Sequence, residues 1–222
     1  KLAEAATHYA EALKINPGNM SARLNMGNAL DLQGRGAEAI EQYAKVLERY
    51  PNYMDAHYNM GLALARMGRN KEAIAHYRQA IRIDPRNADT RINLGLALSY
   101  EGQYDEAIVQ LTEAIRLAPT GAEACNNLGT VFARKGDMGE AIRWFQEAVK
   151  ISPGFAKAHS NLAGALAMQG KKEEANSHYV EATRLAPEDA ELPYNWANLL
   201  VDEGQVAEAI HYYEQAIQLA PQ

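Results

Sequence analysis

Apolar and small residues recur along the chain in pairs of helical stripes. In the segment that starts at Met20 they occupy its positions 3, 7, 8, 10 and 11, which together form one face of a helix. A second stripe occupies positions 20, 21, 24, 27 and 28. A glycine lies between the stripes and a proline follows the second, and both residue types end helices. The pattern predicts two helices, over about residues 20–33 and 37–50.

The same pattern returns every 34 residues. We therefore number positions within each repeat from 1, with Met20 as position 1 of the first. The prolines that end the repeats are Pro17, Pro51, Pro85, Pro119, Pro153, Pro187 and Pro221. The spacing predicts the second helix of a truncated repeat at residues 1–19, full repeats at 20–53, 54–87, 88–121, 122–155 and 156–189, and a last repeat at 190–222.

A pair of helices cannot bury its apolar stripes alone, so neighbouring pairs must stack. Position 8 is glycine or alanine and position 20 is alanine, and small residues let two helices approach closely. We predict an all-α fold, an α-solenoid of stacked antiparallel helix pairs that forms a single domain over residues 1–222.

The repeat resembles the tetratricopeptide repeat (TPR), which has large-x2-Leu-Gly, Ala, aromatic, Ala and Pro positions at this period. The resemblance covers the whole chain and implies a right-handed superhelix whose first helices line a concave groove. Two departures stand out. Alanine replaces the position-8 glycine at Ala163 and Ala197. The usual position-4 tryptophan is replaced by Arg23, His57, Arg91, Cys125, His159 and Pro193.

Composition is that of an ordinary folded protein, with 47% apolar residues, 23% charged residues and a net charge of −6. The mildly acidic balance gives no basic footprint for nucleic acid, and no apolar run reaches the length of a membrane span. A single cysteine excludes an intrachain disulfide and fits a reducing compartment, so we expect a cytoplasmic location. The chain begins within a repeat and without methionine, so we expect it to be part of a longer protein.

No residue pattern indicates catalysis. The chain lacks HExxH, CxxC and a phosphate-binding glycine loop. The position-23 histidines lie in non-adjacent repeats, so we expect surface residues and no metal cluster; they are His8, His76 and His178. We expect His57 and His159 to be packing residues and Cys125 to be a small residue on a helix face. The sequence therefore predicts no enzyme, no metal and no cofactor.

Position 6 is asparagine in every repeat, although asparagine is a mediocre helix former. These residues are Asn25, Asn59, Asn93, Asn127, Asn161 and Asn195. At 100° per residue, position 6 lies at the border between the packing stripe and the polar face. Each amide could bond to the neighbouring repeat, or it could hold the main chain of an extended peptide, since it both donates and accepts. The ladder resembles that of the TPR superhelix of O-GlcNAc transferases.

Further side chains of the first helices would face the same groove. They are Leu24, Tyr58, Leu62, Arg66, Ile92, Leu96, Tyr100, Thr130, Arg134, Ser160 and Tyr194. The carboxylate clamp of some TPR domains needs lysine at position 5, which no repeat has, so we do not expect recognition of acidic C-terminal tails in that manner.

We predict a non-catalytic scaffold that binds an extended peptide or a segment of a partner protein in the groove. The alternative is a TPR domain that recruits substrates for a larger enzyme, such as a glycosyltransferase resembling O-GlcNAc transferase, with the catalytic domain outside residues 1–222. A third possibility is end-to-end self-association through the last helix, because Ile210, Tyr213 and Ile217 have no capping helix to cover them.

Overall fold

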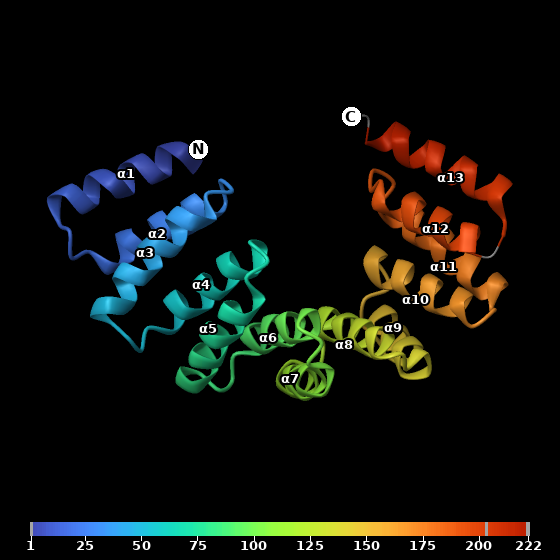
Figure 1. Ribbon diagram of the computed structural model, residues 1–222, viewed down its shortest axis with the longest axis horizontal. Coiled ribbons are helices and arrows are strands. Elements are labelled where there is room, and N and C mark those ends of the chain that lie inside the picture. The colour runs from blue at the N-terminus through green and yellow to red at the C-terminus, as the bar shows by residue number, and fades with distance from the viewer. Residues whose placement is uncertain (1, 203, 221–222) are drawn as a thin grey trace. The chain divides into compact units, whose positions relative to one another are not determined.

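The computed structural model describes residues 2–202 and 204–220, and within them the chain forms thirteen helices and no strands (Figure 1). The first helices of the repeats are α2 (Met20–Asp31), α4 (Met54–Arg66), α6 (Ala88–Tyr100), α8 (Ala122–Lys135), α10 (Ala156–Met168) and α12 (Glu191–Asp202). The second helices are α1 (Leu2–Ile15), α3 (Gly36–Arg49), α5 (Asn70–Ile83), α7 (Tyr104–Leu117), α9 (Met138–Ile151), α11 (Lys172–Leu185) and α13 (Val206–Leu219). The predicted all-α fold of antiparallel helix pairs is confirmed.

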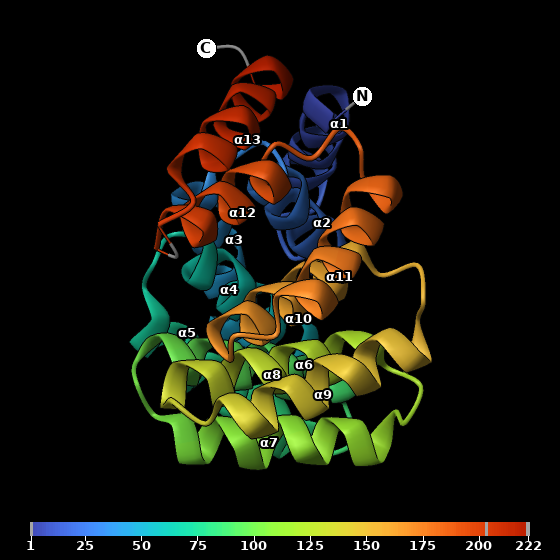
Figure 2. The ribbon, with the colours of Figure 1, turned by 90° about the vertical axis from the view of Figure 1, so that its right-hand side faces the viewer.

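The helices form two compact units, one that ends at Ala118 and one that begins at Pro119. The first contains α1 and the pairs α2–α3, α4–α5 and α6–α7. The second contains the pairs α8–α9, α10–α11 and α12–α13 (Figure 2). In every pair the two helices pack directly on each other, as the apolar stripes require. That all the repeats form a single domain stays a prediction.

The glycine at position 15 ends each first helix by adopting a left-handed backbone conformation, with φ between 73° and 91°. Gly34 donates its N–H to the carbonyl of Asp31 at 2.9 Å, and Arg35 donates to that of Leu30 at 3.0 Å. This pair of bonds is a Schellman motif, which satisfies the last carbonyls of a helix. Equivalent bonds follow the other five glycines, so one local device turns the chain into the second helix of every repeat.

The core of a repeat forms where position 8 faces position 24. A methyl group added to Gly61 would lie 2.5 Å from the ring of Tyr77, and the same distance separates such a group on Gly27 from the ring of Tyr43. In these two repeats glycine therefore leaves the space into which the tyrosine ring packs. The alanines at position 20 are completely buried beside this contact: Ala39, Ala73, Ala107, Ala141, Ala175 and Ala209.

Each helix contains 12 to 14 residues. Within residues 2–202 and 204–220, none of them combines the length and the apolar character that crossing a membrane requires.

Candidate functional site in the second unit

A hollow of about 410 Å³ lies among the first helices of the second unit. Five of the predicted groove residues line it: Thr130, Arg134, Ser160, Asn161 and Asn195. Its remaining lining side chains are small or apolar: Ala133, Met138, Phe145, Gly164, Ala165, Met168 and Leu199. Residues from α8, α9, α10 and α12 therefore meet at one concave surface, with two asparagines of the ladder on its wall.

Gly164 keeps this hollow open. A methyl group built on Gly164 would meet only Leu199, at 3.9 Å, which is an ordinary contact. At the equivalent position 9 of the first repeat, Asn28 accepts a hydrogen bond of 2.8 Å from Tyr43. Without such a side chain, the buried hydroxyl of Tyr179 has no partner. In the fifth repeat, glycine at position 9 therefore leaves the Tyr179 hydroxyl without a hydrogen bond and leaves the space that forms part of the hollow.

Two ladder asparagines bond across neighbouring repeats. Asn93 Nδ2 donates to Tyr58 Oη at 3.2 Å and to the carbonyl of Asp89 at 2.9 Å. Asn161 Nδ2 donates to Asn126 Oδ1 at 2.8 Å. In both, the partner in the preceding repeat is a polar side chain at position 5, 35 residues earlier. At these rungs the amide connects two repeats.

The other four asparagines of the ladder differ from these two in their hydrogen bonding. Among the described residues, the side chains of Asn25, Asn59 and Asn195 have no hydrogen-bond partner; Asn25 and Asn195 are exposed and Asn59 is half-buried. For Asn59 the residue 35 positions earlier is Leu24, which cannot accept a hydrogen bond. Asn127 is buried and its Nδ2 has no partner. Asn195, exposed at the edge of the hollow, has its donor and acceptor available for a bound chain.

The remaining predicted groove residues are distributed along both units. Leu24 lies in the hydrophobic core of the first unit, and Arg66 forms an ion pair with Asp31. Tyr100 and Tyr194 are exposed. The half-buried ones are Tyr58, Leu62, Ile92 and Leu96. These side chains are not gathered around the hollow of the second unit.

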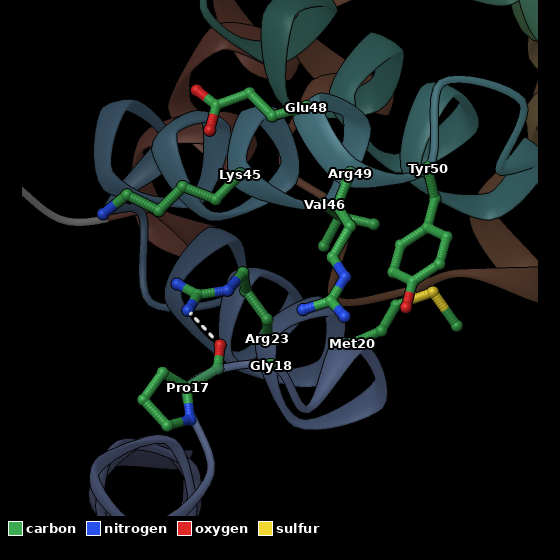
Figure 3. Close-up of a pocket in the computed structure, with 9 residues that line it drawn as sticks. All are labelled: Pro17, Gly18, Met20, Arg23, Lys45, Val46, Glu48, Arg49 and Tyr50. Carbon is green, nitrogen blue, oxygen red and sulfur yellow. Dashed lines mark hydrogen bonds between the residues drawn. The ribbon is translucent and has the colours of Figure 1, made fainter.

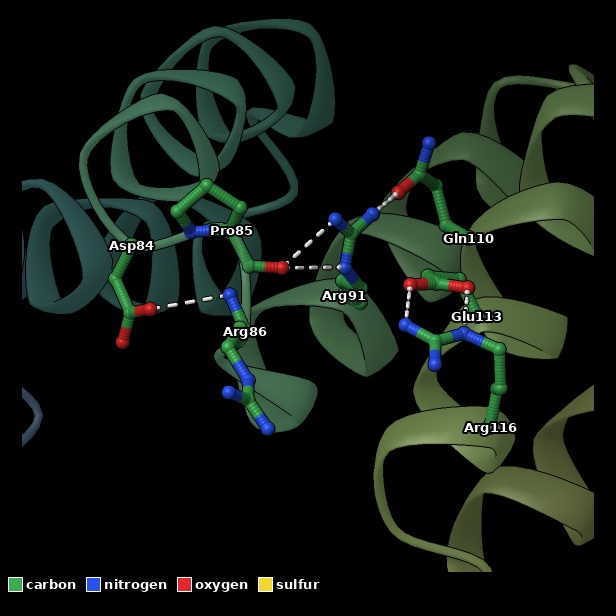
Figure 4. Close-up of polar contacts among 7 residues, drawn as sticks. All are labelled: Asp84, Pro85, Arg86, Arg91, Gln110, Glu113 and Arg116. Carbon is green, nitrogen blue, oxygen red and sulfur yellow. Dashed lines mark hydrogen bonds and ion pairs between the residues drawn. The ribbon is translucent and has the colours of Figure 1, made fainter.

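In four repeats the position-4 side chain forms polar contacts that helical periodicity does not predict, and we call this arrangement the bracket. Arg91 donates through Nη2 to the carbonyl of Pro85 and through Nη1 to Gln110 Oε1, both at 2.8 Å (Figure 4). Arg23 does the same with Pro17, at 2.8 Å, and with Gln42. The bracket fastens the turn before a repeat to position 23 of its second helix. In the first repeat, Arg23 also lines a hollow of about 430 Å³ (Figure 3).

Histidine pairs form this bracket in two repeats. His57 bonds through Nε2 to the carbonyl of Pro51 and through Nδ1 to Nδ1 of His76, both at 3.0 Å. His159 bonds in the same way to Pro153, at 3.1 Å, and to His178, at 3.0 Å.

The predicted surface role of the position-23 histidines is thus wrong for His76 and His178, which are half-buried and paired, while His8 is exposed. Burial, and then the neighbouring imidazole, lowers the pKa of His76 and of His178. The two position-4 histidines, His57 and His159, are buried as expected of packing residues.

A sequence signal for these brackets exists. Positions 4 and 23, which lie 19 residues apart, change together as Arg–Gln, His–His, Arg–Gln, Cys–Trp, His–His and Pro–Tyr from the first repeat to the last. Helical periodicity does not reveal this signal, because it relates residues of one helix only and the two positions lie on different helices.

Helix pairs that repeat every 34 residues and stack on their neighbours define a helical-repeat solenoid protein. Family models described as tetratricopeptide repeat match residues 1–53, 24–88, 92–156, 64–119, 132–192 and 192–222. The chain belongs to the tetratricopeptide repeat family. Members of this family are interaction modules, so the fold makes another protein the class of partner.

Solved structures agree with this assignment. The crystal structure of MamA is 26% identical, with a TM-score of 0.66 over 75% of this chain and 97% of MamA. YrrB, described as a TPR protein with an unusual peptide-binding site, is 26% identical, with a TM-score of 0.64 over 84% of this chain and 96% of YrrB. A tetratricopeptide repeat protein from Parabacteroides merdae ATCC 43184 is 17% identical, with a TM-score of 0.85 over 99% of this chain and 87% of that protein, and shows the fold alone. No curated protein sequence matches the chain significantly.

Proposed function

We propose that the chain is a scaffold that binds an extended segment of a partner protein in the hollow of the second unit. The observation that carries the proposal is the exposed amide of Asn195 at the edge of a 410 Å³ hollow with an apolar wall. An extended main chain presents N–H and C=O groups of every residue, and one carboxamide can satisfy one of each.

The wall of the hollow suits an apolar side chain of the ligand. Met138, Phe145 and Leu199 line it, and Gly164 leaves the space between them open. Pockets for small ligands combine apolar walls with a few polar groups that fix orientation. In this arrangement the polar groups are those of Asn161, Asn195 and the neighbouring hydroxyl residues, and they would fix the main chain while the hollow receives one side chain.

Asparagine variants test the proposal. A peptide selected from a random library on the intact protein is the probe, and its affinity and the melting temperature are measured together. We expect Asn195→Ala to weaken binding about 3- to 10-fold, the equivalent of one hydrogen bond of about 0.5–1.5 kcal/mol, with an unchanged melting temperature. Asn93→Ala is the control, because its amide bonds to Tyr58 within the first unit and its loss should lower stability without changing affinity.

The proposal is wrong if Asn195→Ala binds the selected peptides as tightly as the wild type does. It is also wrong if no library peptide is retained by the protein at all.

We also propose, on separate evidence, that the chain self-associates through α13. Ile210 is 52% exposed and Ile217 is 67% exposed. Beside them lies a hollow of about 390 Å³ that is lined almost entirely by apolar side chains, Tyr194 and Tyr213 among them. Ile217→Glu should abolish the concentration-dependent rise in mass that we expect in sedimentation equilibrium. A wild type that stays monomeric at all concentrations would contradict this proposal and leave the peptide proposal untouched.

A further inference from the structure

In the two histidine pairs, the hydrogen-bonded nitrogens have the separation of two adjacent ligands of one metal ion. In each, two Nδ1 atoms face each other at 3.0 Å. Two metal–nitrogen bonds of about 2.0–2.1 Å that meet at a right angle place their nitrogens about 2.9 Å apart. The separation therefore fits two adjacent ligands of one square or octahedral cation.

The buried histidine of each pair already has the orientation that a ligand needs. A carbonyl oxygen only accepts, so His57 must carry its proton on Nε2, which donates to Pro51, and this leaves the lone pair on Nδ1, the ring nitrogen nearer His76. His159 is held in the same way by Pro153. Metal-bound histidines commonly donate their other ring N–H to a backbone carbonyl, which fixes the tautomer and the ring orientation.

The second histidine of each pair is available to a cation. His76 and His178 are half-buried, so each pair is partly accessible from solvent. Glu72 lies one helical turn before His76 and forms an ion pair with Arg69 at 2.7 Å, and Glu174 lies one helical turn before His178.

We propose that each histidine pair, His57–His76 and His159–His178, binds one divalent transition-metal ion of the Ni²⁺ or Cu²⁺ class through its two Nδ1 atoms. Imidazole suits these ions, and tetragonal geometry places adjacent ligands at right angles. On binding, the proton between the rings moves to Nε2 of His76 or His178, so no net proton is released. Among the described residues, no group of three or more His, Cys, Asp or Glu side chains surrounds one point, so water completes the coordination.

The other repeats separate metal binding from the structural role of the bracket. Gln42 and Gln110 occupy position 23 in the first and third repeats, where each accepts a hydrogen bond from the position-4 arginine. In His76→Gln and His178→Gln the amide can donate to the lone pair of the buried histidine. The bracket then persists, while one of the two nitrogen ligands is lost.

Titration of the intact protein with NiCl₂ by isothermal calorimetry tests the proposal. We expect two ions per chain for the wild type, one for His76→Gln or His178→Gln, and none for the double variant. His8→Gln is the matched control, because His8 also occupies position 23 but is exposed, and it should still bind two. Binding that survives in the double variant, or its absence from the wild type, would overturn the proposal.

A second measurement does not depend on variants that fold. In nuclear magnetic resonance spectra of the wild-type protein, paramagnetic Ni²⁺ should broaden the imidazole ring signals of four histidines, His57, His76, His159 and His178. The ring signals of His8 and His211 should stay sharp. Broadening of His8 or His211 alone would mean ordinary surface binding and would also overturn the proposal.

Discussion

Tyr77→Ala is expected to lower the free energy of unfolding by about 3–5 kcal/mol, the range for removing a large aromatic side chain from a core. Tyr77 is 1% exposed, and its ring fills the space beside Gly61 between α4 and α5. Removal leaves a cavity that the helices cannot close fully, because the completely buried Ala73 and Ala80 already hold the second helix close. Urea unfolding followed by circular dichroism measures the loss.

In Tyr77→Ala, the repeat that contains α4 and α5 should unfold before the others, because each repeat is stabilised by its own packing and by that of its neighbours. Hydrogen exchange should therefore show faster opening of α4 and α5 than of the second unit. Tyr77→Phe is the matched control, since Phe145 fills the same position in the fourth repeat, and it should cost less than about 1 kcal/mol. A loss under 1 kcal/mol in Tyr77→Ala would mean that the aromatic ring does not stabilise the pair.

Gly61→Leu is expected to destabilise the protein by about 3 kcal/mol, at the upper end of the usual cost of overpacking. Even a single added methyl group would lie 2.5 Å from Cε1 of the buried Tyr77. Leucine is the informative substitution, because Ala163 and Ala197 show that position 8 accepts one methyl group in other repeats. Thermal and urea unfolding of the purified variant give the measurement.

Gly164→Leu is the matched substitution, at position 9 of the fifth repeat, whereas Gly61 occupies position 8 of the second repeat. Its Cβ has an ordinary contact with Leu199 at 3.9 Å, and leucine favours a helix over glycine by about 0.5–1 kcal/mol, so stability should rise by about that amount. The new side chain fills the hollow, so peptide binding should be lost. Equal effects of the two substitutions on stability would refute the assigned packing. Retained peptide binding in Gly164→Leu would refute the location of the binding site.

The helix boundaries and the stacking of helix pairs could be predicted from residues that lie close together in the sequence. The glycine at position 15 and the proline at position 32 end helices through backbone conformations of their own, so the predicted boundaries agree with α2 and α3 to within about two residues. The stacking of pairs followed from apolar stripes that one pair cannot bury. Five predicted groove residues lie together around the hollow because they occupy similar faces of adjacent first helices, which this stacking places side by side.

Whether a ladder asparagine bonds to the preceding repeat cannot be derived from the sequence of its own helix. Asn93 and Asn161 connect repeats because Tyr58 and Asn126 stand 35 residues earlier, while Asn59 has Leu24 there. The same holds for His76 and His178, whose partners lie 19 residues away on the facing helix. Periodicity assigns a residue to a face, but the bond depends on which side chain the neighbouring helix brings to that point.

The sequence by itself determined the repeat, the helix pairs and the class of fold, because glycine, proline and apolar spacing act within a few residues of one another. Only the tertiary structure decided which amides stay available for a bound chain, where Gly164 opens a hollow, and that two histidine pairs bring their nitrogens to 3.0 Å. Those outcomes depend on distances between helices, which close packing sets.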